Sequence, residues 1–403
     1  MAVGENILPE LKPVSGITIG TANAGIKQTQ RDDIAVVAMA EGSSCAAVFT
    51  QNAFCAAPVL LAWENLQKKP RWLLINSGNA NAGTGRQGIR AAQSTCAALA
   101  ELVAARPESV LPFSTGVIGE NLPAAKIAAA LPAALAALSE HAWEAAARAI
   151  MTTDTFAKGS SRQVTIAGET MTITGIAKGA GMIQPNMATM LAFIGCDAKI
   201  ARPLLQQCLE QAVEQTFNRI TVDGDTSTND ACVLMASGCS AAPEITGSCG
   251  IREFSGAVLE VCQDLAEAII RDGEGATKFI RIVVQQAVTE QEALQVAKTI
   301  AHSPLVKTAF FASDPNWGRI LAAVGRAGIA DLDIDRIVMY LGDVCIVRNG
   351  GRADDYRETD GQRVMAGDEI TVTVDLGRGQ EAGQVLTCDF SYDYVRINAE
   401  YRT

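Results

Sequence analysis

Short apolar runs alternate along this chain with longer segments of helical period. The strand-like runs are bounded mostly by Gly, Asn, Asp or Ser and cover Ile34–Ala40, Trp72–Ile75, Val110–Phe113, Val164–Ile166, Met171–Ile173, Met190–Ile194, Phe279–Val284, Val338–Leu341 and Ile370–Val374. Helical stripes cover Ile89–Ala105, Ala124–Leu138, a segment started by Pro203, and Val258–Ile270, which we expect Ser255 to cap and Gly273 to close. The alternation predicts a layered α/β fold in which helices cover the sheets.

Three further patterns refine this prediction. The runs at 164–166 and 171–173 flank a turn at Ala167–Glu169, which predicts an antiparallel hairpin and hence mixed sheets. The polar stretch Asn349–Gln362 indicates a long surface loop. The apolar-rich end, Tyr392–Thr403, is expected to be tied into a sheet, which would bring Asn398 and Thr403 near a site.

Composition narrows the class of protein. With 403 residues, 48% of them hydrophobic and 19% charged, the chain is long enough for one large α/β unit or two domains. A net charge of −11 and few aromatics argue against binding to nucleic acid or an anionic membrane. The hydrophobic stretch at 122–137 is interrupted by Lys126 and Pro132, so it cannot span a bilayer. Eleven scattered cysteines without a CxxC motif, and no secretion signal, indicate a reduced, cytoplasmic protein.

Histidine is scarce, which limits the available chemistry. His141 and His302 are the only two histidines, and each is expected to be structural. A zinc site built from several histidines is therefore excluded, and a Ser-His-Asp triad has few candidates. We expect no metal and no bound cofactor, and we look for a catalytic base elsewhere.

The pair Ala188-Thr189 offers such a base. It stands where a glycine-rich turn, with Gly179 and Gly181, runs into an apolar strand, and Lys178 can add positive charge there. If the bond before Thr189 breaks, its new α-amino group titrates at about 7.7–8.0 beside its own hydroxyl. One residue then supplies both nucleophile and base. On composition alone, an ordinary strand threonine is the commoner explanation.

Several other polar segments have both a chemical and a structural interpretation. Ser114–Gly119 follows a strand and can hold an oxyanion, or it is an ordinary strand-to-loop turn. Asn76–Ala82 is most simply an Asn/Gly turn. Glu274, among glycines past a helix end, can bind a substrate ammonium or be a solvated turn residue. Asp223–Asp230 fails as a calcium loop, because Thr228 and Leu234 stand where glycine and glutamate are required.

Taken together, these segments resemble the ornithine acetyltransferase family, the glutamate N-acetyltransferases of arginine biosynthesis. The resemblance spans the chain and rests on Asn76–Ala82, Ser114–Gly119, Met151–Thr155, Lys178–Phe193, Thr221–Asp230, Gly273–Lys278, Ser313–Arg319 and Asn398–Thr403. It implies an αββα fold like that of N-terminal-nucleophile hydrolases. It also implies self-cleavage between Ala188 and Thr189 into an α chain, 1–188, and a β chain, 189–403, in an α2β2 heterotetramer.

The resemblance also implies roles for single residues. Thr189 is the nucleophile, and Thr115 and Gly116 form the oxyanion hole. The substrate-contacting positions are Thr152, Lys178, Thr189, Glu274, Asn398 and Thr403. The substrates would be N-acetylornithine and glutamate, and acetyl-CoA stays open as a second acetyl donor. Two alternatives remain: an N-terminal-nucleophile amidase or aminopeptidase, and a non-catalytic ligand-binding protein with an uncut chain.

Overall fold

The computed structural model describes residues 3–4, 7–27, 30–184 and 190–400. The chain divides into two compact units. We call the larger one, residues 7–218 and 225–269, the sandwich unit, because it holds two sheets. The smaller one, residues 1–6, 219–224 and 270–403, is the single-sheet unit.

The sandwich unit begins with a four-stranded sheet in the order β1-β2-β4-β5. Its strands β4 and β5 run parallel, and its other neighbours are antiparallel. The elements of this half are β1 (Ile17–Ala22), β2 (Ile34–Met39), α1 (Ala57–Asn65), β4 (Trp72–Asn79), α2 (Gly85–Leu102), β5 (Val110–Val117), α3 (Ala124–Ala136) and α4 (Trp143–Ala149).

The second sheet of this unit has five strands in the order β3-β10-β8-β7-β6. Only its β8–β10 pair is parallel. The elements are β3 (Ser44–Phe49), β6 (Lys158–Ile166), β7 (Glu169–Lys178), β8 (Leu191–Cys196), α5 (Arg202–Gln215), β10 (Ala231–Ala236) and α6 (Ile251–Arg271).

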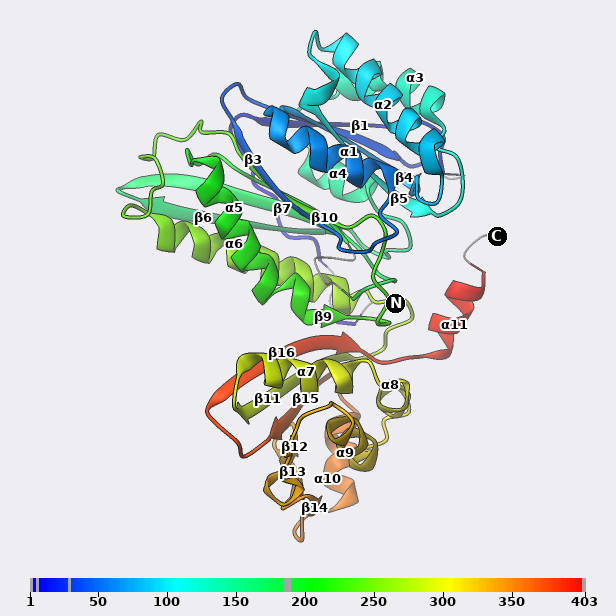
Figure 1. The fold of residues 1–403 in the computed structure, drawn as a ribbon, viewed down its shortest axis with the longest axis vertical. Coiled ribbons are helices and arrows are strands. Elements are labelled where there is room, and N and C mark those ends of the chain that lie inside the picture. Colours follow the sequence, from blue (N-terminus) through cyan, green and yellow to red (C-terminus); the bar gives the residue numbers. More distant parts are fainter. Residues whose placement is uncertain (1–2, 5–6, 28–29, 185–189, 401–403) are drawn as a thin grey trace. The chain divides into compact units, whose positions relative to one another are not determined.

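The layers of the sandwich unit follow from which side chains share a core. The two sheets face each other, and Phe113 meets Phe193 edge to face between them, with ring centroids 5.1 Å apart. The outer face of the four-stranded sheet packs against α2 and α3, while α6 lies on the five-stranded sheet, where Gly175 leaves room for Val261. Figure 1 shows α2 and α3 at one outer side and α5 and α6 at the other. The predicted αββα class, with mixed and antiparallel sheets, is confirmed here.

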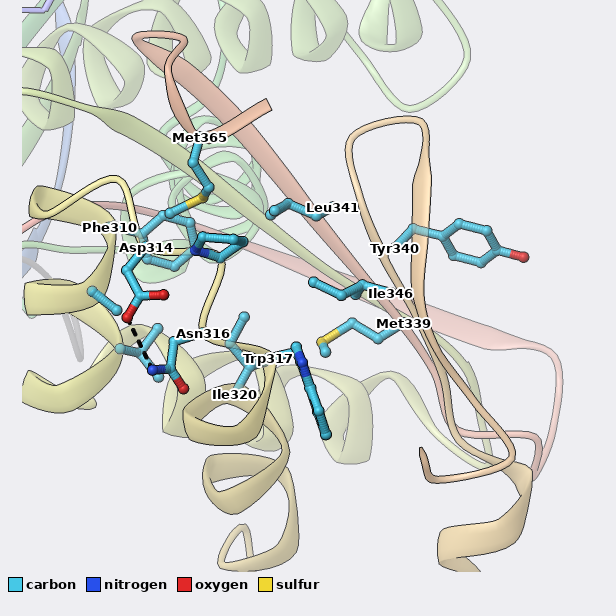
Figure 2. Close-up of a pocket in the computed structure, with 13 residues that line it drawn as sticks. Phe310, Asp314, Asn316, Trp317, Ile320, Met339, Tyr340, Leu341, Ile346 and Met365 are labelled. Carbon is cyan, nitrogen blue, oxygen red and sulfur yellow. Dashed lines mark hydrogen bonds between the residues drawn. The ribbon is translucent and has the colours of Figure 1, made fainter. Parts of the chain in front are cut away.

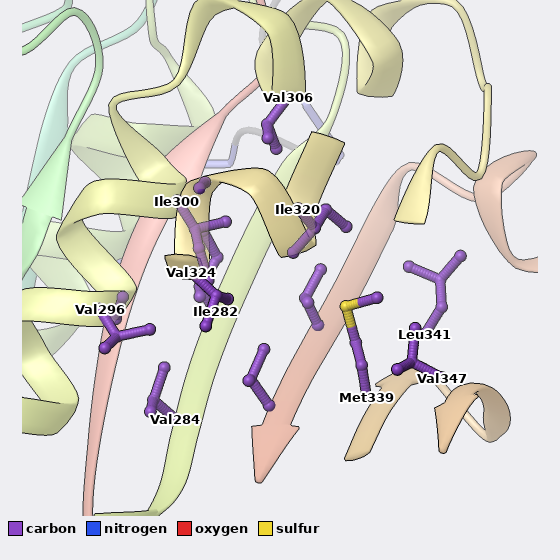
Figure 3. Packing of buried hydrophobic residues seen from close by; sticks show 14 of the residues in the cluster. Ile282, Val284, Val296, Ile300, Val306, Ile320, Val324, Met339, Leu341 and Val347 are labelled. Atoms are coloured by element: carbon purple, nitrogen blue, oxygen red, sulfur yellow. The ribbon is translucent and has the colours of Figure 1, made fainter. Parts of the chain in front are cut away.

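The single-sheet unit adds a separate core to this arrangement. Its seven-stranded sheet has the order β14-β13-β12-β15-β11-β16-β9. Helices α7 to α9 pack on this sheet through Val296, Val306 and Ile320, and Figure 3 shows Val296 near the strand residues Ile282 and Val284 of the same core. Its elements are β9 (Ile220–Thr221), β11 (Phe279–Ala287), α7 (Glu290–Ala301), α8 (Pro304–Phe311), α9 (Trp317–Gly325), β12 (Val338–Leu341), β13 (Val344–Arg348), β14 (Gly351–Arg352), α10 (Glu358–Met365), β15 (Glu369–Asp375), β16 (Glu381–Cys388) and α11 (Tyr392–Ala399).

The hairpin prediction is confirmed, since β6 and β7 pair antiparallel up to Ile166 opposite Glu169. The predicted cap at Ser255 is wrong, because α6 starts at Ile251 and the Ser255 hydroxyl donates to the Arg252 carbonyl inside the helix. The apolar stripe extends one turn earlier than predicted, since Phe254 is fully buried.

Two predicted irregular or extended segments are helical instead. The expected loop at 349–362 contains β14 and the start of α10, because Tyr356 and Met365 join the core of the single-sheet unit. The C-terminal segment forms α11, capped by the Ser391 hydroxyl, and it is not a strand. The apolar side chains that suggested a sheet, such as Tyr392 and Val395, are exposed.

Candidate active site

The predicted oxyanion segment lies at the end of β5, where the pairing with β4 becomes irregular at Gly78 and Asn79. Thr115 and Gly116 continue β5, and Gly116 pairs with Gly78 of β4. The expected turns begin later than predicted, because β4 continues to Asn79 and β5 continues to Val117. Gly116 has a φ of +135°, and a Cβ there would overlap the Gly78 carbonyl carbon, so only glycine fits.

Buried side-chain amides fix these strand ends. The Ser114 hydroxyl donates to Asn76 Oδ1 across 2.6 Å, and Asn76 Nδ2 donates to the Asn79 carbonyl across 2.9 Å. Asn229, from the segment before β10, donates to the carbonyls of Ala80 and Ser114 across 2.6 and 2.9 Å. Because the Ser114 carbonyl belongs to the peptide before Thr115, Asn229 orients that peptide. This network explains the asparagine-rich sequence at 76–82.

Lys178 joins the two sheets of the sandwich unit at this point. It is the last residue of β7 and is buried, and its Nζ donates to Thr115 Oγ1 across 3.2 Å. Since the hydroxyl oxygen accepts this bond, the Thr115 O–H can donate elsewhere. The structure thus brings the predicted residues Thr115, Gly116 and Lys178 together.

The next part of the site is the buried carboxylate of Asp154. Its Oδ1 accepts from Lys158 Nζ at 2.6 Å and from the Gly179 N–H at 2.7 Å, and its Oδ2 accepts from the Thr152 N–H at 2.9 Å. Burial alone would raise the pKa of this carboxyl, but the ammonium groups of Lys158 and Lys178 and the hydrogen bonds hold it well below its usual range. Asp154 therefore stays ionised and ties the predicted residue Thr152 to the segment after Lys178.

Two more ionisable groups lie in this neighbourhood. Lys27 Nζ donates to the carbonyls of Ala149 and Met151 across 3.2 and 2.7 Å, and burial lowers its pKa to about 8. Asp230 is fully buried, which raises its carboxyl pKa well above the usual value, and its Oδ2 has no hydrogen-bond partner among the residues the structure describes.

The single-sheet unit positions Glu274 and Asn398 together. Glu274 follows α6 in a turn, and the residue is buried, with 7% of its surface exposed. Asn398, on α11, donates from Nδ2 to Glu274 Oε2 across 2.8 Å. A second hydrogen bond fixes the turn, because the Ser391 hydroxyl donates to the Gly275 carbonyl across 2.5 Å.

Three of the predicted residues, Ala188, Thr189 and Thr403, lie outside the described residues. The connection that contains the predicted cleavage position joins β7 to β8, and Lys178 is paired with Leu191 where the two strands meet. Both described ends of this connection therefore reach the site.

The segment Ser313–Arg319 has a structural role in the single-sheet unit. Asn316 Oδ1 accepts from the Arg319 N–H and so caps α9, while its Nδ2 donates to Asp314 across 3.0 Å. Figure 2 shows this pair beside a largely apolar pocket lined by Trp317, Met339 and other residues of α8, α9 and the β12–β13 hairpin.

His302, the other group singled out in the sequence, caps the C-terminal end of α7. Burial, with the charges of Lys307, Lys298 and Arg326, lowers its pKa to about 4, so its imidazole is neutral near pH 7. Within the described residues no cluster of three His, Cys, Asp or Glu side chains could hold a metal, and no helix is long and apolar enough to cross a membrane.

The sequence analysis missed Asp154, Lys27 and Asn229. Asp154 and Asn229 lie inside segments that carried the family resemblance, and each directly follows a threonine, which was an available signal. Lys27 lies in a loop without any recognised motif, and only the folded structure places it near Met151.

The structure thus defines a layered α/β protein with a buried Thr-Lys-Asp cluster where its two sheets meet. A family model described as the ArgJ family matches residues 18–403. Arginine biosynthesis bifunctional protein ArgJ of Methylococcus capsulatus is 64% identical over 394 residues, which are 98% of this chain and 97% of that protein. The chain belongs to the ArgJ family, which confirms the resemblance and the prediction of an enzyme of arginine biosynthesis.

Two solved structures are also similar. Arginine biosynthesis bifunctional protein ArgJ from Bacillus halodurans is 42% identical with a TM-score of 0.50, and the match covers 52% of this chain and 99% of that chain. Ornithine acetyltransferase from Mycobacterium tuberculosis, solved with ornithine, is 32% identical with a TM-score of 0.39, covering 44% of this chain and 94% of that one.

Proposed function

We propose that this chain is a self-cleaving acetyltransferase that moves the acetyl group of N-acetylornithine to glutamate. The observation that carries the proposal is the hydrogen bond from Lys178 to Thr115, beside the glycine-only position Gly116. It leaves the buried Thr115 O–H as a donor, and in the proposal this O–H and the Gly116 N–H stabilise a developing oxyanion.

Maturation comes first in the proposed sequence. Thr189 Oγ attacks the Ala188 carbonyl, the acyl group shifts from nitrogen to oxygen, and water hydrolyses the ester. The products are an α chain, 1–188, and a β chain, 189–403, which stay associated as α2β2. In support, the solved Bacillus halodurans chain is matched over 99% of its length by 52% of this chain, so it is about half as long.

Acetyl transfer then proceeds by a ping-pong route. The new Thr189 amine takes the proton of its own hydroxyl, and Oγ attacks the acetyl carbonyl of N-acetylornithine. Thr115 and Gly116 stabilise the oxyanion, and ornithine leaves with the proton. The amine of glutamate next attacks acetyl-Thr189, which regenerates the free threonine. The proposed substrate-binding residues are Thr152, Lys178, Thr189, Glu274, Asn398 and Thr403.

The proposal assigns no bound cofactor or metal, keeps acetyl-CoA as a second donor, and places the enzyme in the cytoplasm. The eleven free cysteines favour a reducing compartment.

The test combines chain analysis with donor and acceptor assays. Freshly expressed wild-type protein should give two bands on denaturing electrophoresis, with a second N-terminus at Thr189, and Thr189→Ala should give one band near 42.3 kDa. N-acetylornithine should acetylate the β chain, and glutamate should discharge it as N-acetylglutamate. Acetate release that glutamate leaves unchanged would instead identify an amidase. A parallel assay with acetyl-CoA and glutamate decides whether the enzyme has a second activity.

A further inference from the structure

Lys27 is held in place by a buried carboxylate. Asp33, fully buried at the start of β2, accepts from the backbone N–H groups of Ala24, Ile26 and Lys27 at 2.6, 2.6 and 3.2 Å. A carboxylate that accepts from three N–H groups of one short segment fixes the backbone from Ala24 to Lys27. The backbone at Lys27 is therefore defined by the fold.

The Lys27 side chain crosses the end of β4 toward the candidate site. A Cβ on Gly78 would lie 3.0 Å from Lys27 Cγ, and Gly78 is the strand partner of Gly116. Beyond Gly78, the ammonium reaches the carbonyls of Ala149 and Met151, and Thr152 is the next residue. Lys27 thus lies between the oxyanion segment and the Thr152 turn.

The charges around Lys27 leave positive charge in excess. Both of its hydrogen-bond acceptors within the described part of the chain are carbonyl oxygens, and Lys178 and Arg31 repel its charge while Asp33 and Asp154 attract it. Asp154 is already paired with Lys158, and Asp33 is occupied by three N–H groups. Asp230, the buried carboxyl that interacts with Lys178, has a raised pKa that favours its neutral form. A half-buried cation in such surroundings is stabilised by an anionic ligand.

We propose that Lys27 is a further substrate-binding residue that pairs with the α-carboxylate of the acetylated amino-acid donor. The α-carboxylate is only a few bonds from the acetyl carbonyl, so an oxyanion at Thr115 and Gly116 places it near the same strand ends. Lys27 has an N–H left after its two carbonyl bonds, because an ammonium carries three donors. This role rests on the proposed function and adds a residue to its donor site.

The test compares two donors that differ only in this carboxylate. Single-turnover acetylation of the β chain is followed by intact mass with N-acetylornithine and with its α-carboxamide, using wild type, Lys27→Met and Lys27→Arg. A charge-assisted hydrogen bond is expected to give about a tenfold to hundredfold loss of kcat/KM for the carboxylate donor in Lys27→Met. The carboxamide donor should lose less than about threefold, and Lys27→Arg should keep most of the preference.

Lys126→Met is the matched control, because the exposed Lys126 ammonium donates to the Gly25 carbonyl of the same loop. Lys126→Met should leave kcat/KM for both donors unchanged. Equal losses for both donors in Lys27→Met, with normal cleavage of the chain, would mean that Lys27 only holds the Thr152 turn and would overturn the proposal. A wild-type β chain that no donor acetylates would overturn the proposed function itself.

Discussion

Lys178 and Thr115 come from different sheets and meet across a 3.2 Å hydrogen bond between Nζ and Oγ1. The lysine ends β7 of the five-stranded sheet, and the threonine lies near the end of β5 in the four-stranded sheet. The bond directs the Thr115 lone pair toward the ammonium and leaves its hydrogen for another acceptor. A single contact between the layers thus prepares a donor that neither sheet would orient alone.

Thr115→Val tests this donor with little change in shape. Loss of one oxyanion-hole donor is expected to lower kcat by about a hundredfold to a thousandfold. Steady-state transfer of acetyl from N-acetylornithine to glutamate measures it, after electrophoresis has confirmed that the chain is cut. Thr165→Val, the same change at an exposed position of β6, should leave kcat unchanged. A Thr115→Val enzyme with wild-type kcat would remove Thr115 from the oxyanion hole.

Gly116→Ala tests the close approach of β4 and β5. The new Cβ would overlap backbone atoms of Gly78 and Asn79, which cannot rotate away, and the φ of +135° disfavours any side chain. We expect a loss of about 3 kcal/mol or more in unfolding free energy, or no folded protein. Gly256→Ala is the control, because a Cβ in this part of α6 meets open space, and it should stabilise the helix by about 0.5–1 kcal/mol. Urea denaturation measures both changes, and equal stability of the two variants would contradict the argument.

These residues also show how far the sequence could predict the site. Local pattern located most strands, and the segments with glycine, threonine and asparagine marked Thr115, Gly116 and Lys178 as candidates. The pattern could not show that Asn76 and Gly116 continue their strands, since Asn and Gly ordinarily end them. In the structure, buried amide hydrogen bonds and the Gly78–Gly116 pairing compensate for that poor propensity.

Long-range contacts were the other limit on prediction. The C-terminal apolar residues had the composition of a strand, yet α11 leaves Tyr392 and Val395 exposed. Asn229 contacts Ser114 from 115 positions away, and Lys27 contacts Met151 from 124 positions away. Neither contact has a local signal, so only the packed sandwich unit reveals them.

Asp154→Asn tests the buried ion pair beneath the site. Removing the carboxylate leaves the Lys158 ammonium buried without its partner, and the amide cannot accept from all of the donors that Asp154 serves. We expect a loss of about 3–5 kcal/mol in unfolding free energy near pH 7. Urea denaturation followed by tryptophan fluorescence measures it, since Trp63, Trp72 and Trp143 belong to the sandwich unit.

The pH dependence of Asp154→Asn follows from the lowered pKa. A carboxyl whose folded pKa is depressed contributes stability that is present above its unfolded pKa of about 3.9 and is lost as the pH falls. The variant should therefore lose less stability than wild type between about pH 5 and pH 2. Glu144→Gln is the control, because Glu144 and Arg148 have the same i,i+4 spacing but lie largely in solvent, and it should change stability by less than about 1 kcal/mol. Equal losses of unfolding free energy in Asp154→Asn and Glu144→Gln would show that burial of the Asp154–Lys158 pair does not add to its stabilising effect.

Glu274→Gln tests whether the buried carboxylate of the single-sheet unit recognises the side-chain ammonium of the donor. Glutamine keeps the size of Glu274 and an oxygen that accepts the Asn398 bond, so the turn between Gly273 and Gly275 should persist. Loss of the charge should raise KM for N-acetylornithine by about tenfold to a hundredfold, the value of a charged hydrogen bond. N-acetylnorvaline is a donor whose side chain carries no charge, and its acetylation of the β chain should change less than about threefold.

The hydrogen bond from Asn398 to Glu274 allows a second test of this prediction, with a smaller expected effect on KM. Asn398→Ala removes one donor to a carboxylate that stays charged, so KM for N-acetylornithine should change by no more than about tenfold, with unchanged stability because α11 buries none of its side chains. Arg396→Ala, on the same exposed helix and with Asp393 as its ion-pair partner among the described residues, should leave KM unchanged. If Glu274→Gln impairs the reactions of N-acetylornithine and N-acetylnorvaline equally, the Glu274 carboxylate shapes the turn and does not recognise the ammonium. If KM rises only for N-acetylornithine, the Glu274 carboxylate recognises the side-chain ammonium of the donor.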